Sequence, residues 1–270
     1  MKHSNLLGRL GSMGVTLLVA AGFSGELAAQ TLTTLYSFAG LPDGASPLAG
    51  VISDATGNLY GTTEFGGNTI CGSGGCGTVF KLTPNGSGGY GETVLYTFTG
   101  PDGAFPYTGD LITDAAGNLY GTTNEGGGGV CALNGSCGVV FKLTPNGSGG
   151  YSETVLYRFA VASPSDGAIP LAGLIADAMG NLYGTTVQSG GGGACGVPGC
   201  GIVFKLTPNG SGAYSETVLY RFTGGTDGAA PRAGLISDAM GNLYGTTAGG
   251  GGGGSACGVP GCGIVCMANS

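Results

Sequence analysis

The sequence predicts an all-β protein: a β-propeller of about four four-stranded antiparallel blades, either whole or as a fragment of a larger propeller. The motif G-L-I-x-D-A-x-G-N-L-Y-G-T-T, or a close variant, occurs four times, and its aspartates are 60, 63 and 61 residues apart. A fixed period of this size indicates a repeat architecture. Each of the first three repeats also contains four short segments rich in β-branched and aromatic residues, and no window has a sustained helical period. The units lie near residues 50–108, 109–172, 173–233 and 234–270.

The second unit shows how one blade is expected to form. Asp114–Asn118 contains the Gly and Asn that tight turns need for positive φ, and an Asn146-Gly pair is a strong hairpin signal. A glycine-rich loop, residues 124–137, separates the two hairpins. Four strands are expected, at Gly109–Ile112, Leu119–Thr123, Gly138–Leu143 and Glu153–Phe159. A linear β-solenoid is the alternative, but its coils are usually shorter and its strands are not joined by hairpins.

The N-terminal segment, residues 1–29, has the pattern of a secretory signal peptide. Lys2 and Arg9 precede an apolar core, Met13–Phe23, that is too short to span a bilayer. Small residues follow, so cleavage is expected near Ala29-Gln30, leaving residues 30–270 as the repeat domain. An uncleaved membrane anchor is the alternative. No later stretch is long and apolar enough to span a membrane, so we expect none after cleavage.

Composition limits the class of partner. Glycine and proline, 62 and 12 of 270 residues, reach the range in which disorder must be considered, but the glycines cluster between strand patterns. We therefore expect ordered sheets with long loops. Removing residues 1–29 takes away Lys2, Arg9 and Glu26, which leaves 14 acidic and 6 basic residues and a net charge of −8. This charge repels phosphate backbones and disfavours nucleic-acid binding.

The two ends of the repeat region are complementary. Residues 31–38 include Thr34–Phe38, which matches the fourth strand of the later units, and the last unit has only three strand segments. The N-terminal strand could therefore complete the last sheet and close four blades. The other interpretation is a fragment of a longer array. Cys266 stands where the other units have Phe80, Phe141 and Phe204, so the last strand departs from the repeat.

These motifs resemble a known family. The order G-x-I-x-D-x-x-G-N-L-Y, then V-F-K-L, then F-x-G-x-x-D-G-A-x-P is similar to a blade of NHL-type propellers. Over residues 31–265 the unit more closely resembles the tandem repeat of secreted bacterial choice-of-anchor GloVer-repeat proteins. The resemblance implies export, a repeat domain, often a C-terminal surface-sorting segment, and no established activity. This sequence has no sorting segment after Cys266, so the resemblance does not extend to surface anchoring.

Eight cysteines form local pairs inside the glycine loops. In an exported chain such pairs indicate disulfides, each clamping the base of one loop. Metal thiolate binding is the alternative, but histidine is lacking and the spacing is not C-x2-C. Cys266 is left over as a free thiol, an intermolecular bridge or a consequence of the unusual last strand. The expected disulfides are Cys71–Cys76, Cys131–Cys137, Cys195–Cys200 and Cys257–Cys262.

Carboxylates recur at two turns of every unit. Asp and Asn side chains in such turns usually hydrogen-bond their own backbone, which is the role we expect. Calcium is the alternative, but each turn supplies too few oxygens, so no metal site is predicted. The repeat-turn pairs are Asp54 with Asn58, Asp114 with Asn118, Asp177 with Asn181 and Asp238 with Asn242, and the Asp-Gly-Ala turns add Asp43, Asp102, Asp166 and Asp227.

No catalytic or cofactor-binding residue is predicted. The only histidine, His3, lies in the signal segment, which excludes Ser-His-Asp and Cys-His machinery. The glycine runs lack the Lys-Ser/Thr of a phosphate loop. Paired carboxylates could serve glycoside chemistry, but the acids recur in every unit. Asp110, Glu64 and Glu125 break the repeat pattern, and nothing near them indicates a site.

We therefore expect a secreted or cell-surface repeat protein that acts as a binding or structural module, without catalysis. Its loops should share one rim that suits an extracellular polysaccharide or protein partner. The alternative function is a carbohydrate-active enzyme with carboxylates at one end of the propeller. A third hypothesis is a purely architectural surface protein.

Overall fold

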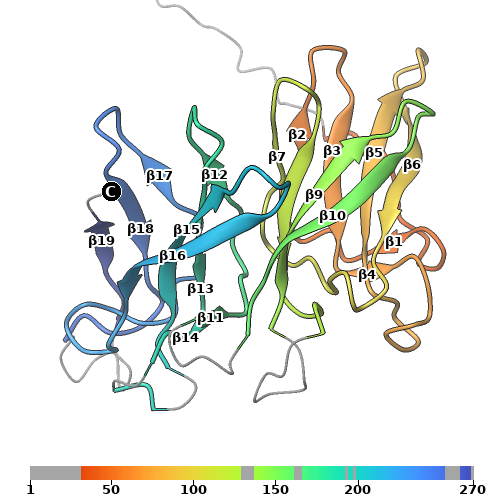
Figure 1. Ribbon diagram of the computed structural model, residues 1–270. Helices are drawn as coiled ribbons and strands as arrows, with labels where there is room; N and C mark the ends of the chain where they lie inside the picture. Colours follow the sequence, from red (N-terminus) through yellow and green to blue (C-terminus); the bar gives the residue numbers. More distant parts are fainter. Residues whose placement is uncertain are drawn as a thin grey trace, which may run out of the picture. The chain divides into compact units, whose positions relative to one another are not determined.

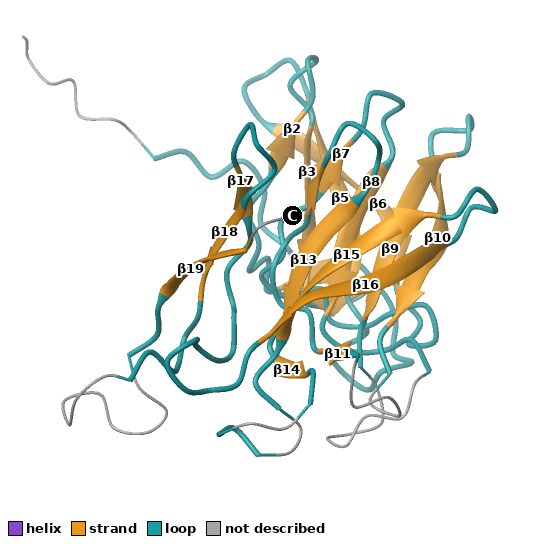
Figure 2. Cartoon of the chain, turned by 60° about the vertical axis from the view of Figure 1, so that its left-hand side comes forward, coloured by secondary structure: helices purple, strands orange, loops and turns teal. Residues whose placement is uncertain are grey.

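The computed structural model describes residues 32–128, 137–160, 166–191, 194–196, 199–252 and 262–268. The chain divides into two units, residues 1–34 and residues 35–270, and every strand belongs to the second. All regular structure in the described residues is β-strand, and none of it is helical (Figure 2). The all-β prediction is confirmed.

The strands form four principal antiparallel sheets, which follow one another in chain order (Figure 1). Sheets 1 to 3 have four strands, each paired with the next strand of the same sheet, and sheet 4 has three among the described residues. Sheet 1 is β2 (Ile52–Ser53), β3 (Leu59–Thr63), β5 (Thr78–Pro84) and β6 (Tyr90–Thr97); sheet 2 is β7 (Ile112–Thr113), β8 (Leu119–Thr123), β9 (Val139–Pro145) and β10 (Tyr151–Arg158); sheet 3 is β12 (Ile175–Ala176), β13 (Leu182–Thr186), β15 (Ile202–Pro208) and β16 (Tyr214–Arg221); sheet 4 is β17 (Ile236–Ser237), β18 (Leu243–Thr246) and β19 (Val265–Ala268).

Each outer strand contains a β-bulge at the same place. The register of β10 against β9 shifts between Val155 and Tyr157, and β6 and β16 shift at the corresponding position. In a regular strand successive side chains point to opposite faces, but the extra residue of a bulge breaks this alternation. As a result, Leu156 and Tyr157 of sheet 2 both pack toward sheet 3, whereas Val155 packs toward sheet 1 on the opposite face.

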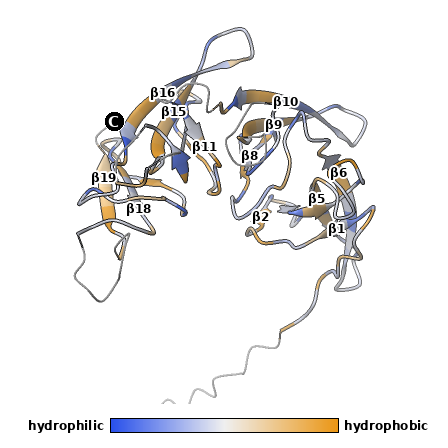
Figure 3. Cartoon of the chain, turned by 90° about the horizontal axis from the view of Figure 1, so that it is seen from below, coloured by the Kyte–Doolittle hydropathy of each residue, from blue (hydrophilic) through white to orange (hydrophobic). Residues whose placement is uncertain are grey.

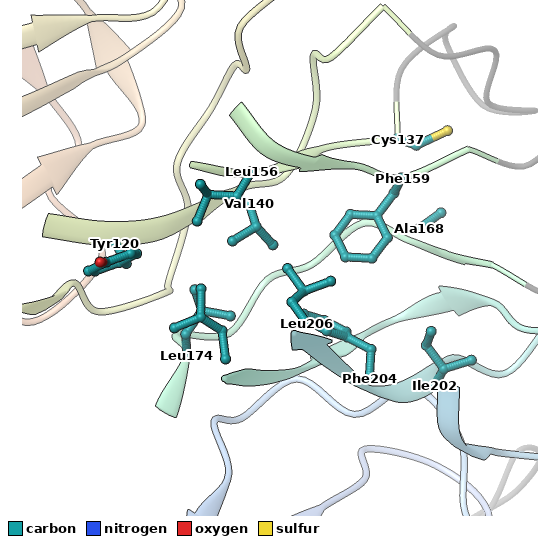
Figure 4. Packing of buried hydrophobic residues seen from close by; sticks show 11 residues of the cluster. Tyr120, Cys137, Val140, Leu156, Phe159, Ala168, Leu174, Ile202, Phe204 and Leu206 are labelled. Carbon is teal, nitrogen blue, oxygen red and sulfur yellow. The ribbon is translucent and has the colours of Figure 1, made fainter. Parts of the chain in front are cut away.

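The sheets are held together by apolar clusters between neighbouring faces. One cluster joins sheets 1 and 2, a second joins sheets 2 and 3, and a third joins sheets 3 and 4. Figure 4 shows the second cluster. Sheet 2 and the segment after it contribute Val140, Leu156 and Phe159. Leu174, Phe204 and Leu206 come from sheet 3 and the residue before it. In Figure 3 the apolar colouring follows these strands. Each sheet therefore buries the face of the next, as propeller blades do.

Phenylalanine pairs recur at each junction. Phe98 meets Phe141 edge-to-face at 5.1 Å between ring centroids, and Phe159 meets Phe204 at 5.2 Å. Such T-shaped pairs stabilise by about 0.5–1.5 kcal/mol beyond the area they bury. The ring of Phe141 lies across its strand partner Gly121, where an added Cβ would lie 2.6 Å from Phe141 Cζ. The glycine of L-Y-G-T-T is therefore required to seat the ring.

The links between sheets are pinned by backbone hydrogen bonds. The Asp-Gly-Ala segment pairs with the loop that follows the second strand, as β1 (Gly44–Ala45) with β4 (Phe65–Gly66) and β11 (Gly167–Ala168) with β14 (Gln188–Ser189). The next residue, Ile169, has φ of 63°, donates its N–H to Cys137 O and accepts from Val187 N–H. Phe105 and Ala230 make the same two-sided bridge. Each link thus ties the loop of one sheet to the loop of the next.

The N-terminal segment does not complete the last sheet. Phe38 packs edge-to-face on Phe80 of sheet 1 with 4.9 Å between centroids, and Tyr36 donates to Asp43. Phe98, which follows the outer strand of sheet 1, makes the equivalent contact with Phe141 of sheet 2. Phe38 therefore lies on sheet 1 as the residue after an outer strand lies on the following sheet. Residues 32–38 pair with no strand in the described chain, and β19 pairs with β18 alone. The closure considered from the sequence is therefore not what the structure shows.

The glycine under the ring gives a first prediction. Gly121→Ala should lower the free energy of unfolding by about 2 kcal/mol, because the methyl group would overpack against Phe141 and Leu111. Gly245→Ala is the matched control: sheet 4 has Cys266 in place of the phenylalanine, and the added Cβ would meet only the end of Leu235. Denaturant unfolding should show less than half the loss for the control, and equal losses would contradict the packing role.

Candidate functional site

The repeat turns between first and second strands are built around one aspartate each. Asp114 Oδ1 accepts hydrogen bonds from the backbone N–H groups of Ala116 and Asn118, at 2.9 and 3.0 Å. Its Oδ2 accepts from Asn118 Nδ2 at 2.7 Å and from Tyr120 Oη at 2.9 Å. The same four bonds recur in the other three turns, around Asp54, Asp177 and Asp238.

The asparagine of each turn faces inward, whereas the sequence singled it out only as a turn residue. Asn181 is 3% exposed, donates its backbone N–H to Asp177 Oδ1 at 2.9 Å, and donates Nδ2 to Asp177 Oδ2 at 2.6 Å. Its backbone carbonyl also accepts the N–H of Asp177, which closes the turn. Asn181 lines none of the clefts described below, so it supports the turn from within and is not a contact residue for a ligand. Asn58 and Asn118 are buried in the same way, and the half-buried Asn242 makes the same bonds; none of them lines a cleft.

These bonds hold the turn aspartates ionised. The hydrogen bond from Asn58 is the main cause of the lowered pKa of Asp54, and the bond from Asn242 acts in the same way on Asp238. At Asp114 and Asp177 burial acts to raise the pKa, but hydrogen bonds from the asparagine and tyrosine outweigh it and the pKa is lowered. Because both oxygens are saturated by protein donors, these carboxylates stabilise the turn. In the described part of the chain no three His, Cys, Asp or Glu side chains come together as a metal site.

A lysine covers the tyrosine of each of the first three turns. Lys81, Lys142 and Lys205 place Nζ 5.6–5.7 Å from the ring centroids of Tyr60, Tyr120 and Tyr183, within cation–π range. The lysine lies opposite the tyrosine on the neighbouring strand, so the register sets the contact. In sheet 4, Met267 stands opposite Tyr244 instead.

Between successive turns of the described chain lie three clefts of increasing size. The cleft between sheets 1 and 2 has a volume of about 110 Å³ and is partly filled by Tyr151, whose Oη lies 3.4 Å from Gly117 O. The cleft between sheets 2 and 3 has about 220 Å³. The cleft between sheets 3 and 4, here called the 3–4 cleft, has about 450 Å³. The residues lining the 3–4 cleft are Ile175, Ala176, Asp177, Met179, Tyr183, Lys205, Ser237, Asp238, Ala239, Gly241 and Leu243.

The 3–4 cleft is largest for a structural reason. Tyr151 enters the first cleft from the start of the outer strand β10, and Tyr214 stands at the same place in β16. Sheet 4 has no outer strand among the described residues, so no outer-strand tyrosine equivalent to Tyr151 lines the 3–4 cleft. The repeat signal in the sequence places the turns, but it does not reveal the clefts between them.

A second set of carboxyl groups lies at the Asp-Gly-Ala links. Asp102 accepts hydrogen bonds from Tyr96 Oη and from the backbone N–H and hydroxyl of Thr99. Asp227 repeats this with Tyr220 and Thr223, and Asp43 accepts from Tyr36 and the backbone N–H of Ala39. Asp166 accepts from the backbone N–H groups of Ala160 and Gly167. These aspartates tie the end of one outer strand to the link that follows it.

Three outer-strand glutamates face this set, and sequence reasoning missed them. Glu92, Glu153 and Glu216 each have one buried oxygen with no hydrogen-bond partner. Burial, helped by repulsion from Asp102, raises the pKa of Glu153 to about 7 against the attraction of Arg158. Burial and Asp166 raise the pKa of Glu216 to about 7 against Arg221. Recognising these pairs requires knowing which residues meet across two sheets.

The cysteines lie in the loops between second and third strands. Cys71–Cys76 and Cys195–Cys200 are bonded, with Cα atoms 5.1 and 5.4 Å apart. Cys137 and Cys262 are disulfide-bonded as well, and their expected partners Cys131 and Cys257 lie outside the described residues. Cys266 is a free, half-buried thiol with a pKa raised by burial.

The acids that break the repeat do not form a site. Asp110 Oδ1 accepts a hydrogen bond from the backbone N–H of Gly50, which ties sheet 2 to the start of sheet 1. Burial raises the pKa of Glu64 and of Glu125. Nowhere in the described part of the chain is there a helix long and apolar enough to cross a membrane.

The buried glutamates predict how stability depends on pH. Their folded-state pKa of about 7 lies above the unfolded value of about 4.3, so the folded state binds more protons between these values. The stabilisation is complete below pH about 4.3 and is lost as the pH rises through about 7. We expect a loss on the order of 1 kcal/mol per glutamate, because solvent screens these half-buried groups.

Urea unfolding between pH 4.5 and 8 measures this loss. The double variant Glu153→Gln, Glu216→Gln should have a much flatter profile over the same range. A wild-type stability that rises with pH in this window, or an unchanged slope in the double variant, would contradict the assignment.

Comparison with solved structures gives distant neighbours, and no curated protein matches this chain. A protein titled a putative gluconolactonase has 18% identity and a TM-score of 0.44, over 74% of this chain and 57% of that one. A Xanthomonas campestris protein titled a gluconolactonase important in glucose secondary metabolic pathways has 16% identity and a TM-score of 0.41, over 81% and 57%. The matches thus span a little over half the length of either structure.

The family model provides the assignment. The model described as the Gloeobacter/Verrucomicrobia repeat matches residues 21–198, which is more than half of the sequence. The matched range covers the first two sheets and part of the third. The chain belongs to the Gloeobacter/Verrucomicrobia repeat family.

Proposed function

We propose that this chain is an exported repeat module that binds an extracellular polysaccharide without chemically altering it. Export is proposed from the signal-like pattern of residues 1–29. Two disulfides in the described residues support an oxidising compartment, where such bonds persist. Both observations support the proposed secreted or cell-surface location.

The observation that carries the proposal is the 3–4 cleft. Its volume of about 450 Å³ falls within the usual range for small-ligand sites, whereas the other two clefts are below it. Ile175 and Leu243 contribute an apolar wall, and Ser237 and Lys205 contribute polar groups. This mixture suits a sugar ring, which has apolar C–H faces and a rim of hydroxyls.

Charge favours a neutral glycan over a polyanion. The sequence without residues 1–29 has a net charge of −8, and Asp177 and Asp238 line the cleft in ionised form. Lys205 is the one cationic side chain among the lining residues, and its ammonium group can donate to hydroxyl oxygens. The saturated aspartates hold the cleft walls in place, since their oxygens are already engaged with the turn.

One observation favours the carbohydrate-active enzyme as second candidate. Glu153 and Glu216 have the raised pKa of a general acid, and each lies near an aspartate. However, the unpartnered oxygen of each is buried at a sheet junction, and neither residue lines any of the three clefts. The binding role is therefore the better supported of the two.

Retention on insoluble neutral polysaccharides tests the proposal. Lys205→Met should weaken binding about tenfold, because it removes a charged hydrogen-bond donor from the 3–4 cleft. Lys142→Met is the matched control, since Lys142 covers Tyr120 in the same way but does not line any of the three clefts. Reducing ends released during incubation are measured in parallel. Absence of retention across the panel, equal loss in the control, or release of reducing ends would overturn the proposal.

A further inference from the structure

Sheets 1 and 4 each have one face that no neighbouring sheet covers in the described residues. Apolar side chains on these two faces are exposed, whereas their equivalents in the other sheets pack into the clusters between sheets. We call the side of sheet 4 that faces away from sheet 3 the tail face, and the side of sheet 1 that faces away from sheet 2 the head face. Within the chain, the tail-type face of each sheet packs on the head-type face of the next. Sheets 1 and 4 leave one face of each type uncovered by a sheet.

The tail face is apolar where its equivalents are buried. Val79, Val140 and Val203 point toward the following sheet and are at most 3% exposed, whereas Val265 in β19 is 81% exposed. Ile236 is 69% exposed, although the isoleucines at its position in the other sheets pack against the clusters.

The head face has the matching exposure. Leu111, Leu174 and Leu235 point toward the preceding sheet and are at most 5% exposed, whereas Val51 at the same position is 52% exposed. Part of this face is covered by Phe38, which packs on Phe80. Both faces therefore present the apolar surface that three internal junctions of this chain already bury.

In the described residues, the edge of the tail face also lacks a neighbouring strand beyond β19. A cavity of about 150 Å³ beside β19 is lined by Val203, Tyr220, Phe222, Asp227, Ile264, Cys266, Met267 and Ala268. In sheet 2 the outer strand runs along β9 at this place, with Glu153 opposite Leu143 and Val155 opposite Phe141. The cavity thus lies where the side chains of an outer strand lie in the other sheets.

The described residues include one segment that has the sequence of an outer strand but belongs to no sheet. Residues 32–38 carry L-T-T-L-Y-S-F, which aligns with E-T-V-L-Y-R-F of 153–159, and they pair with no strand in the described chain. Leu32 is 99% exposed. Added to β19 in the register of β10 on β9, the segment would set Leu32 opposite Ala268 and Thr34 opposite Cys266. At the position of Tyr151 it carries Gln30, so it brings no aromatic ring to the 3–4 cleft.

From these matches we propose that two copies of this chain associate head to tail. The head face of one copy docks on the tail face of the other, and its residues 32–38 add to β19 as a fourth strand. Strand addition supplies main-chain hydrogen bonds, and alternate side-chain pockets set the register. The interface is heterologous, because two different surfaces meet. This inference does not depend on the polysaccharide-binding proposal.

Sedimentation of the purified chain over a wide concentration range tests the association. The wild type should reach at least twice the mass of one chain. Val265→Asp and Val51→Asp should each remain single, because either change puts a charge in the interface at a site that is exposed in the single chain. An equimolar mixture of the two variants should form a two-chain species, since each supplies the face that the other lacks.

The control is Met179→Asp, which changes a side chain that is 76% exposed but lies on a turn between the end faces. It should associate like the wild type, and all variants should have the wild-type melting temperature at concentrations at which the wild type is single. A wild type that stays single at every concentration, a Val51→Asp variant that still associates alone, or loss of association in the control would overturn the proposal.

The strand is tested separately by Leu32→Asp. This side chain has almost no contact in the single chain and would become buried only after strand addition. We expect the dissociation constant to rise about tenfold, with an unchanged melting temperature at concentrations at which both proteins are single. An unchanged dissociation constant would overturn the strand contribution.

Discussion

The face-to-face packing of one sheet on the next is the constraint on which the rest of this structure depends. A single open sheet cannot cover its own apolar faces, so each sheet relies on its neighbours to bury them. Phe98 on Phe141 and Phe159 on Phe204 mark the centres of two such junctions. Gly121 and its equivalents leave room for the rings, and the bulge in each outer strand turns two successive side chains toward the next sheet.

Much of the architecture could be predicted from local sequence. The Asn-Gly and Asp-x-x-Gly-Asn turns specify hairpins through short-range chemistry, and their recurrence indicates repeated sheets. The bulge at Leu156 was not predicted, because an unbroken apolar run does not show which residue leaves the ladder. The Glu153–Asp102 junction was not predicted either, since its partners come from different sheets. The sequence of residues 31–38 matches an outer strand, but it does not show that Phe38 covers Phe80.

The regularity of the chain also bears on where the two proposed interactions lie. Every turn aspartate is saturated by its own turn, and the asparagine beside it, such as Asn181, is turned inward to hold it. The repeated motif therefore stabilises the fold, and the proposed interactions lie where the pattern is interrupted. Sheet 4 is such a place. Its lack of an outer strand in the described residues leaves the cleft beside Lys205 open and also exposes β19 and Val265. Both proposals, for a ligand and for a second copy, follow from this departure from the repeat.

Native-state hydrogen exchange, resolved by residue, tests most directly whether neighbouring sheets stabilise one another. Sheets 2 and 3 are packed on both faces, so their strands β8, β9, β13 and β15 should exchange only through global opening, with one shared free energy. Strands β18 and β19 should exchange at a lower free energy under conditions in which the chain is single. Equal protection in all four sheets, or protection of β18 and β19 above that of sheet 2, would contradict the account.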